Sequence, residues 1–409
     1  SSESPIQVSI SQFYGIEIND FAVTVAKTAL WIAESQMMKE TEKILLVPLD
    51  FLPLKTNAYI VEGNALRTDW ESVVPKSELN YIMGNPPFVG YSLQSKSQKD
   101  DILSIYVDEK GKPYKTAGKI DYVAGWYFKA TQLMQGTTIR TALVSTNSIT
   151  QGEQVSAIWE PLFTRFGIHI DFAHRTFRWD SEANAKAHVH CVIVGFSCAE
   201  NFTARKLYTE NRSQEVNNIN AYLLNAPDIF VSSRPKALCN VPEMLYGNKP
   251  TDGGFLFLTP EEYETAVSAE PAIKPYIRQI YGASEYINNK LRYCLWLVNV
   301  SPEIIRKSGF IKERVKKVQE FRLASPKEAT RRSAATPALF QEIRQPNSTY
   351  IIVPRHSSET RRYIPFGFVS PQIIVNDAVQ IIPNANIYQF GIMMSNVHMA
   401  WVRAVCGRI

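Results

Sequence analysis

The chain has 409 residues, of which 45% are hydrophobic and 20% are charged, and its formal net charge is +5. This balance excludes a disordered or fibrous protein, and the length suits two domains of roughly 100 to 200 residues each. No apolar run reaches the roughly 20 residues of a membrane-spanning helix, and no basic-then-apolar leader pattern stands at the N-terminus. We therefore expect a cytoplasmic protein without a membrane partner.

The first half alternates short apolar runs with helical patterns, which is typical of an α/β domain built around a largely parallel sheet. The predicted elements begin with a strand at 13–16, a helix continuing to about residue 38, and strands near 58–61 and 81–83. They continue with an amphipathic helix at 123–134 and strands at 141–144, 168–172 and 189–196. The polar, lysine-rich segment 92–119 is expected to be a mobile loop.

After about residue 200 the alternation fades into irregular, turn-rich sequence, with helical patterns near 261–267 and 302–319. We place residues 1–205 in the first domain and 206–409 in the second. Residues 1–200 hold 18 Lys/Arg against 22 Asp/Glu, whereas residues 201–409 hold 26 against 17. The segment 306–362 carries 14 basic and 5 acidic residues. This bias suits a polyanionic partner such as nucleic acid, although a solvated basic face has the same composition.

Cysteine and histidine form no pattern that indicates a metal or a disulfide. The five cysteines are scattered, and no Cys-x-x-Cys pair occurs. His188 and His190 alternate with apolar residues on a predicted strand, and we interpret both as structural. No metal site is predicted.

One motif carries chemistry: Asn85-Pro86-Pro87-Phe88, directly after a predicted strand. In an open α/β sheet this places the loop at the carboxyl ends of the strands, where ligands bind, and the two prolines stiffen it. An aromatic exocyclic amine is a poor nucleophile because its lone pair is delocalised into the ring. The Asn85 side-chain oxygen and the Pro86 carbonyl can accept its two N–H bonds, which directs the lone pair at a methyl donor. Phe88 can stack on the base, although Pro-Pro-aromatic is also an ordinary turn.

Around this motif the chain resembles the gamma-class adenine-N6 DNA methyltransferases, and more narrowly the MmeI-type single-chain restriction–modification enzymes. The resemblance covers essentially the whole chain and rests on Phe13-Tyr14-Gly15-Ile16-Glu17, the Asn-Pro-Pro-Phe loop, Ser148-Ile149-Thr150-Gln151-Gly152-Glu153-Gln154, Thr176-Phe177-Arg178-Trp179 and Ser357-Ser358-Glu359-Thr360-Arg361. It implies a Rossmann-like class I methyltransferase sheet followed by an α+β target recognition domain. The implied activity is transfer of a methyl group from S-adenosylmethionine to N6 of a flipped adenine in double-stranded DNA. The implied setting is the bacterial cytoplasm, and no obligate protein partner is expected.

The resemblance also assigns residues around the loop. Glu17 matches the acid that binds the ribose hydroxyls of S-adenosylmethionine, and Asp69 matches the acid near the adenine amine of that cofactor. A strand-end carboxylate is a bidentate acceptor for a diol, although Glu17 can instead be the acid of a helix N-terminus. Phe177 resembles the aromatic that closes the flipped adenine opposite Phe88. The alternative is that Phe177 or Trp179 belongs to the core.

In the second half, an irregular segment matches the base-reading region of the family. Arginine can address guanine, glutamate can address cytosine, and serine or arginine can bind phosphate. A structural loop with ordinary surface charges is the alternative. The candidate DNA-binding residues are Arg355, Ser357, Ser358, Glu359, Arg361 and Arg362.

The chain departs from the family pattern in one respect. No Asp-x-x-x-Gly-x-Gly-like segment occurs in the first 90 residues, so the chain resembles a fragment that lacks the first strand of the sheet. In the family that strand lies beside the strand leading to the Asn-Pro-Pro-Phe loop, and its loss should leave two unpaired strand edges. We expect weak or no binding of S-adenosylmethionine by these residues alone. No Asp…Glu-x-Lys nuclease motif is present in the first half, so we expect no DNA cleavage.

Other functions remain open. Methyltransferases of protein glutamine amides or of RNA guanine amines share the Asn-Pro-Pro-aromatic logic, but the basic second half favours DNA. A second alternative is a non-catalytic DNA-binding specificity module. The same family features extend to methyltransferases of phage-defence systems, which would change the setting but not the chemistry.

Overall fold

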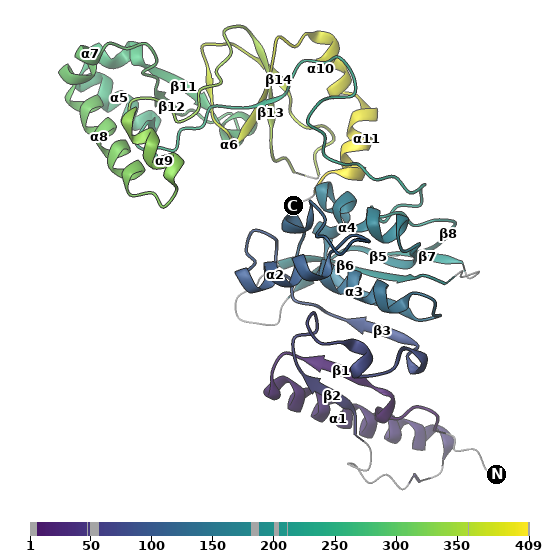
Figure 1. Cartoon of the computed structure of the whole chain (residues 1–409). Coiled ribbons are helices and arrows are strands. Elements are labelled where there is room, and N and C mark those ends of the chain that lie inside the picture. Colours follow the sequence, from purple (N-terminus) through teal and green to yellow (C-terminus); the bar gives the residue numbers. More distant parts are fainter. Residues whose placement is uncertain are drawn as a thin grey trace. The chain divides into compact units, whose positions relative to one another are not determined.

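The computed structural model describes residues 6–46, 48–49, 57–180, 188–199, 204–210, 212–358 and 360–407. The chain divides into two compact units, Ser1–Ser233 and Arg234–Ile409, each of which is described by itself (Figure 1). None of the described helices has the length and apolar character that a membrane crossing requires.

The first unit contains a six-stranded sheet in which β3 pairs with β4 in parallel and β6 runs antiparallel to both β4 and β5. Strands β3, β4 and β5 therefore run in one direction, and their carboxyl ends share one edge of the sheet. In order across the sheet the strands are β3 (Tyr81–Gly84), β4 (Arg140–Thr146), β6 (His188–Ser197), β5 (His169–Asp180), β7 (Arg205–Thr209) and β8 (Arg212–Val216). The sequence predicted β3 to β6 but not β7 and β8, which extend this unit past residue 205.

Helices α3 (Ala124–Met134) and α4 (Gly152–Thr164) pack side by side on one face of this sheet. The buried Tyr127 ring meets Trp159 of α4 edge-on at 5.2 Å and stacks on Phe196 of β6 at 5.4 Å. Large aromatic side chains bury much apolar surface and fix the distance between helix and sheet. The helix predicted over 123–134 is confirmed as α3.

The lysine-rich segment expected to be a mobile loop contains the helix α2 (Lys96–Ile105), so that expectation was wrong. The helix begins with a capping box in which the Ser95 and Gln98 side chains bond each other's backbone amides. Ile102 and Ile105 are buried, whereas Lys96 and Lys99 of the same helix are exposed. Two buried isoleucines at a spacing of three residues thus outweigh the polar composition of the segment.

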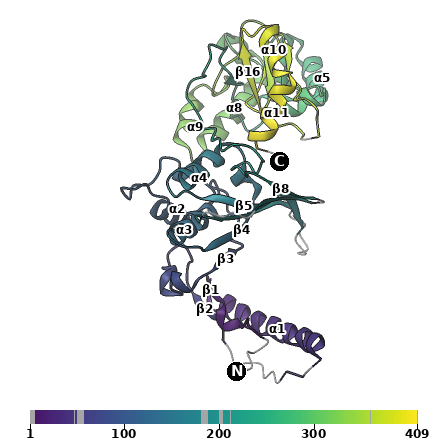
Figure 2. The same cartoon turned by 90° about the vertical axis from the view of Figure 1, so that its right-hand side faces the viewer.

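A separate two-stranded parallel sheet forms from β1 (Tyr14–Glu17) and β2 (Tyr59–Glu62), joined by the helix α1 (Asp20–Leu45). In two views at right angles, β1 and β2 lie beside α1 and apart from β3 (Figures 1 and 2). Among the described strands, β1 pairs only with β2 and β3 only with β4. The two predicted unpaired edges are therefore confirmed. On β3, the Tyr81 and Met83 side chains are 67% and 78% exposed.

The second unit holds two four-stranded sheets. The first consists of β10 (Phe257–Leu258), β12 (Tyr293–Leu295), β11 (Ile277–Tyr281) and β15 (Ile374–Val375). The second consists of β14 (Gly367–Val369), β13 (Tyr350–Pro354), β16 (Val379–Pro383) and β9 (Leu245–Tyr246). The accompanying helices are α5 (Pro260–Ala269), α6 (Ala283–Ile287), α7 (Pro302–Lys307), α8 (Gly309–Leu323), α9 (Glu328–Arg332), α10 (Ile387–Met393) and α11 (Asn396–Val405).

The helical pattern at 302–319 is split between α7 and α8, with Ser308 between them in an extended conformation. The Ser308 hydroxyl accepts a hydrogen bond from the Ile311 amide at 3.1 Å and donates one to the Glu270 carboxylate. A serine cap satisfies a free amide at the start of a helix, which is why the second helix begins here.

Candidate active site

The Asn-Pro-Pro-Phe loop begins where β3 ends, with Gly84 paired to Leu143 of β4. The side chain of Asn85 is exposed, Pro86 is buried, and Phe88 is 37% exposed. Within the described part of the chain, neither the side-chain amide of Asn85 nor the backbone carbonyl of Pro86 forms a hydrogen bond. Two acceptors and an aromatic face are therefore available at the carboxyl edge of the sheet.

Glu17 is the last residue of β1 and is half-buried. Its carbonyl accepts a hydrogen bond from the Gly63 amide at 2.7 Å, which joins it to the loop after β2. The start of α1 is served by other residues: the Asn19 side chain caps the Ala22 amide at 2.9 Å, and Asp20 is the acid of the first turn. The Glu17 carboxylate is therefore not needed as a helix cap.

The loop after β2 carries Asp69, and Lys129 of α3 anchors the backbone of this loop. The Lys129 amino group donates to the carbonyls of Ala65 and Leu66 at 2.9 and 3.0 Å, and also to the carbonyl of Thr68. Burial lowers the pKa of Lys129 below its ordinary value. Asp69 itself is exposed and accepts the Glu71 amide at 3.1 Å, so it faces outward from an anchored loop.

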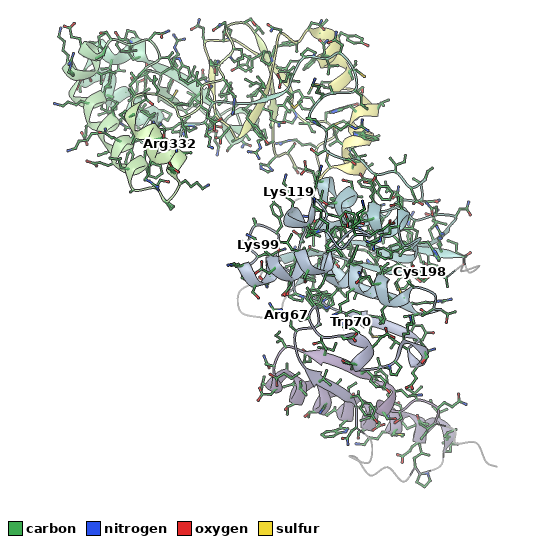
Figure 3. The ribbon with its side chains drawn as sticks, viewed as in Figure 1. Arg67, Trp70, Lys99, Lys119, Cys198 and Arg332 are labelled. Atoms are coloured by element: carbon green, nitrogen blue, oxygen red, sulfur yellow. The ribbon has the colours of Figure 1, made fainter. Side chains whose placement is uncertain are left out.

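The same loop is tied to α2 by the buried carboxylate of Asp101. This group accepts hydrogen bonds from Arg67 Nε at 2.6 Å, Asn64 Nδ2 at 3.2 Å and the Tyr122 hydroxyl at 2.9 Å. Burial, and then the bond to Asp101, raises the pKa of Tyr122 to about 12. Arg67 and Trp70 of this loop are labelled in Figure 3. Nothing in the sequence singled out Lys129 or Asp101, because their partners lie more than 20 residues away.

Phe177 lies on β5 at the same edge of the sheet as the end of β4. In the register, Phe177 pairs with Cys191 of β6, which also pairs with Thr146, the last residue of β4. An irregularity between His174 and Phe177 places an extra residue in β5 just before this point. Such bulges re-aim side chains next to functional sites.

The aromatic side chains at this end of β5 lie largely outside the core. Phe177 is half-buried and meets the His174 ring edge-on at 4.8 Å, while Trp179 is 47% exposed. His190 is exposed on β6, and within the described ranges no three His, Cys, Asp or Glu side chains could hold a metal ion.

In the second unit, the predicted base-reading segment follows β13. The exposed Arg355 side chain donates to the Asp377 carbonyl at 3.1 Å and lies over the Tyr246 ring at 5.1 Å. The Ser357 hydroxyl oxygen is buried and has no hydrogen-bond partner among the described residues. The Ser358 hydroxyl bonds that of Thr360 at 2.7 Å. Glu359 lies outside the described residues.

The end of this segment is anchored by the helix α11. Arg403 donates to the carbonyls of Arg361 and Arg362 at 3.2 and 2.9 Å. The Arg362 side chain is exposed and lies over the Tyr363 ring, whereas Arg361 is half-buried. Fixing the backbone of two arginines leaves their side chains to contact a partner.

Many basic residues of the segment 306–362 have partners within the unit. Four exposed ion pairs have the spacing of one helical turn, namely Lys307–Glu303, Lys316–Glu320, Lys317–Glu313 and Arg332–Glu328. Arg332 of α9 is labelled in Figure 3. Such pairs contribute little stability, but they neutralise the face that carries them. The excess of basic residues in the segment 306–362 therefore does not form one continuous unpaired surface.

An open sheet with an Asn-Pro-Pro-Phe loop at its carboxyl edge, followed by a separate unit of two small sheets, defines a methyltransferase domain joined to a target recognition domain. The chain belongs to the MmeI family. Residues 1–209 match the model of the MmeI DNA-methyltransferase domain, and residues 225–409 match that of the MmeI target recognition domain. The predicted family and fold class are thereby confirmed.

Two relatives are longer than this chain. The chain is 41% identical over 405 residues to DNA methyltransferase A of Bacillus subtilis (strain 168), covering 98% of this chain and 45% of that protein. It is also 41% identical, with a TM-score of 0.91, to the Type IIL restriction–modification enzyme MmeI solved in complex with DNA, covering 99% of this chain and 54% of that one. The chain therefore spans about half the length of these relatives.

Proposed function

We propose that this chain supplies the catalytic sheet and the target recognition domain of a site-specific DNA methyltransferase. The reaction transfers a methyl group to the exocyclic N6 of an adenine flipped out of double-stranded DNA. The observation that carries this proposal is the state of Asn85 and Pro86, whose acceptors are free among the described residues at the carboxyl edge of the sheet. This is where an open α/β sheet binds its ligands.

The loop suits an aromatic amine because it offers hydrogen-bond acceptors and no strongly basic side chain. The Asn85 oxygen and the Pro86 carbonyl accept the two N–H bonds of the amine, so the nitrogen becomes tetrahedral and its lone pair points outward. Phe88 stacks on one face of the base, and Phe177 is the candidate for the other face. Each stacking contact offsets part of the cost of flipping, which is a few kcal/mol. The nitrogen gains the methyl group as the bond between that group and its donor breaks, and the nitrogen releases one proton to water.

The residues present fit the adenosine half of S-adenosylmethionine, which supplies the methyl group when bound. Glu17 ends β1 with a carboxylate that no described residue engages, and Asp69 lies exposed on the anchored loop after β2. The glycine-rich loop for the methionine half has no counterpart in these residues. We therefore expect residues 1–409 alone to bind S-adenosylmethionine weakly, and calorimetric titration giving micromolar affinity would contradict this.

The DNA partner is proposed from the second unit. Arg361 and Arg362 sit on a segment whose backbone is fixed by Arg403, and no described residue pairs with the Arg361 side chain. Arginine recognises guanine edges and phosphates through its planar donors. We propose that Arg355, Ser357, Ser358, Glu359, Arg361 and Arg362 contact DNA.

The test is base-modification sequencing of DNA from a host that carries the complete gene, compared with an Asn85→Ala variant. The matched control is Asn80→Ala, because Asn80 is exposed just before the start of β3, at the opposite end of this strand from Asn85. We expect N6-methyladenine at one sequence with the wild type and the control, and none with Asn85→Ala. Methylated protein or RNA instead of DNA would refute the proposal. Duplex binding that weakens with salt, without methyl transfer at saturating cofactor, would favour a specificity module.

A further inference from the structure

Residues 120–122, which precede α3 in the sequence, hold the loop that follows Phe88. The Val89 carbonyl accepts the Tyr122 amide at 2.9 Å, and the Gln94 side chain donates to the Ile120 carbonyl at 2.9 Å. Between these two bonds, the Tyr91 amide donates to Asp121 Oδ1 at 3.0 Å. The catalytic loop is therefore fixed at one end by β3 and at the other by residues 120–122.

Asp121 joins this loop to two other segments. Its Oδ1 also accepts the Gln154 side chain at 3.2 Å, and its Oδ2 accepts the Ser148 hydroxyl at 2.6 Å. Its own amide donates to Gln154 Oε1 at 3.2 Å. Ser148 stands in the short helical turn after β4, and Gln154 in the first turn of α4. One carboxylate thus connects the ends of β3 and β4 with the start of a helix.

The Asp121 side chain is 7% exposed, and the three groups that donate to it are uncharged. A buried carboxylate is costly unless hydrogen bonds compensate its lost hydration. Bonds to an ionised acceptor are shorter and roughly twice as strong as neutral ones. A side chain that served only to fill the core at this position would not need to be charged. The charge tightens the bonds that hold the catalytic loop.

We propose that Asp121 is the positioning residue of the Asn-Pro-Pro-Phe loop, an inference that rests on the proposed methyl transfer. By fixing the Tyr91 amide, Asp121 limits the movement of Asn85, Pro86 and Phe88 relative to the ends of β3 and β4. The acceptors on this loop act in the transition state, when the amine nitrogen becomes tetrahedral. A displacement of about 1 Å at such groups lowers the rate by about a hundredfold.

The test compares Asp121→Asn, Ser148→Ala and the control Asp108→Asn in the complete gene product. Asparagine has the shape of aspartate and can still accept the Tyr91 amide, but it lacks the charge. Asp108 is a suitable control because its carboxylate also accepts backbone amides, those of Lys110 and Lys112, in a turn outside this network. The measurements are kcat and KM per titrated active site, on the DNA site found by sequencing, and peptide-resolved hydrogen exchange.

For Asp121→Asn we expect kcat to fall about tenfold, with KM for DNA changed less than about twofold. Exchange should rise in the peptide covering residues 85–94 and in the segments that Asp121 joins to it, 120–122 and 147–154, and not in the rest of the first unit. Ser148→Ala should show a smaller rise in the same peptide, which keeps the test informative if Asp121→Asn fails to fold. The control should resemble the wild type.

An unchanged kcat in folded Asp121→Asn would overturn the inference, and so would faster exchange throughout the first unit. The second result would mean that Asp121 supports the fold as a whole. A wild-type protein that leaves adenine unmethylated refutes the proposed function instead. In that case the exchange at residues 85–94 still decides whether Asp121 holds the loop.

Discussion

Arg322 in α8 lies in the most basic part of the sequence, yet its side chain is fully buried in the second unit. Its guanidinium donates five hydrogen bonds of 2.8 to 3.0 Å to backbone carbonyls, those of Pro250, Thr251, Ser333, Thr336 and Leu339. It therefore joins the start of the unit to the turns that follow α8. We predict that Arg322→Met strongly destabilises this unit and does not merely weaken DNA binding.

The magnitude follows from the carbonyls that the substitution leaves behind. The carbonyls of Pro250, Ser333 and Thr336 also accept backbone amides, so the substitution leaves two carbonyls, those of Thr251 and Leu339, without a donor among the described residues. Each buried acceptor without a donor costs roughly 1–3 kcal/mol, so these two cost roughly 2–6 kcal/mol. Since a domain is stable by only about 5–15 kcal/mol, the variant unit should lose a large part of its stability. Lysine keeps the charge but has three donors, so Arg322→Lys should be intermediate.

The assay is urea unfolding of the whole chain followed by peptide-resolved hydrogen exchange. The matched control is Arg306→Met, because Arg306 is exposed on α7 in the same basic stretch. Arg322→Met should lower protection against exchange in the second unit only, while the control keeps it. If Arg322→Met lowers the free energy of unfolding by less than about 1 kcal/mol, the reasoning is refuted. Such a result would mean that water replaces all five hydrogen bonds without cost.

Three further predictions concern the first unit and the recognition segment. Because burial raises the pKa of Tyr122 to about 12, the folded protein should lose stability as the pH rises from about 10 to about 12, where only the unfolded chain is ionised. Tyr122→Phe should lose less over this range in urea unfolding, and equal losses would contradict the assignment. Lys129→Met should loosen the loop of Asp69 and weaken S-adenosylmethionine binding by the complete gene product about tenfold in calorimetry, with DNA affinity unchanged; an unchanged cofactor affinity would count against this role. Arg403→Met should broaden the methylated sequence in base-modification sequencing, and an identical sequence would show that the anchor is dispensable.

Composition counts the basic residues of the second half, whereas the structure shows which of them are paired or buried. The count of 14 basic against 5 acidic residues in 306–362 is correct, but it treats every side chain as equivalent. In the structure some of these side chains pair with glutamates one helical turn away, and Arg322 is an internal donor. Arg361 and Arg362 remain the stronger DNA candidates because only their backbone is engaged by Arg403.

Features that depend on neighbouring residues could be predicted from the sequence. Apolar runs followed by turn residues located β1 and β3, and the helical spacing of apolar residues located α3. The position of Asn85 after β3 followed directly, because two prolines end a strand wherever they occur. The absence of a glycine-rich segment from residues 1–90 also predicted the unpaired edges of β1 and β3 among the described strands.

The roles of residues whose partners lie far along the chain became apparent only from the three-dimensional fold. Asp121 meets Tyr91 and Gln154 across 30 and 33 residues, and Arg322 meets Pro250 across 72. Whether a charged side chain serves solvent, a ligand or the protein's own backbone depends on which groups the fold brings beside it. A local sequence pattern does not contain that information, so the loop was predictable and the carboxylate that holds it was not.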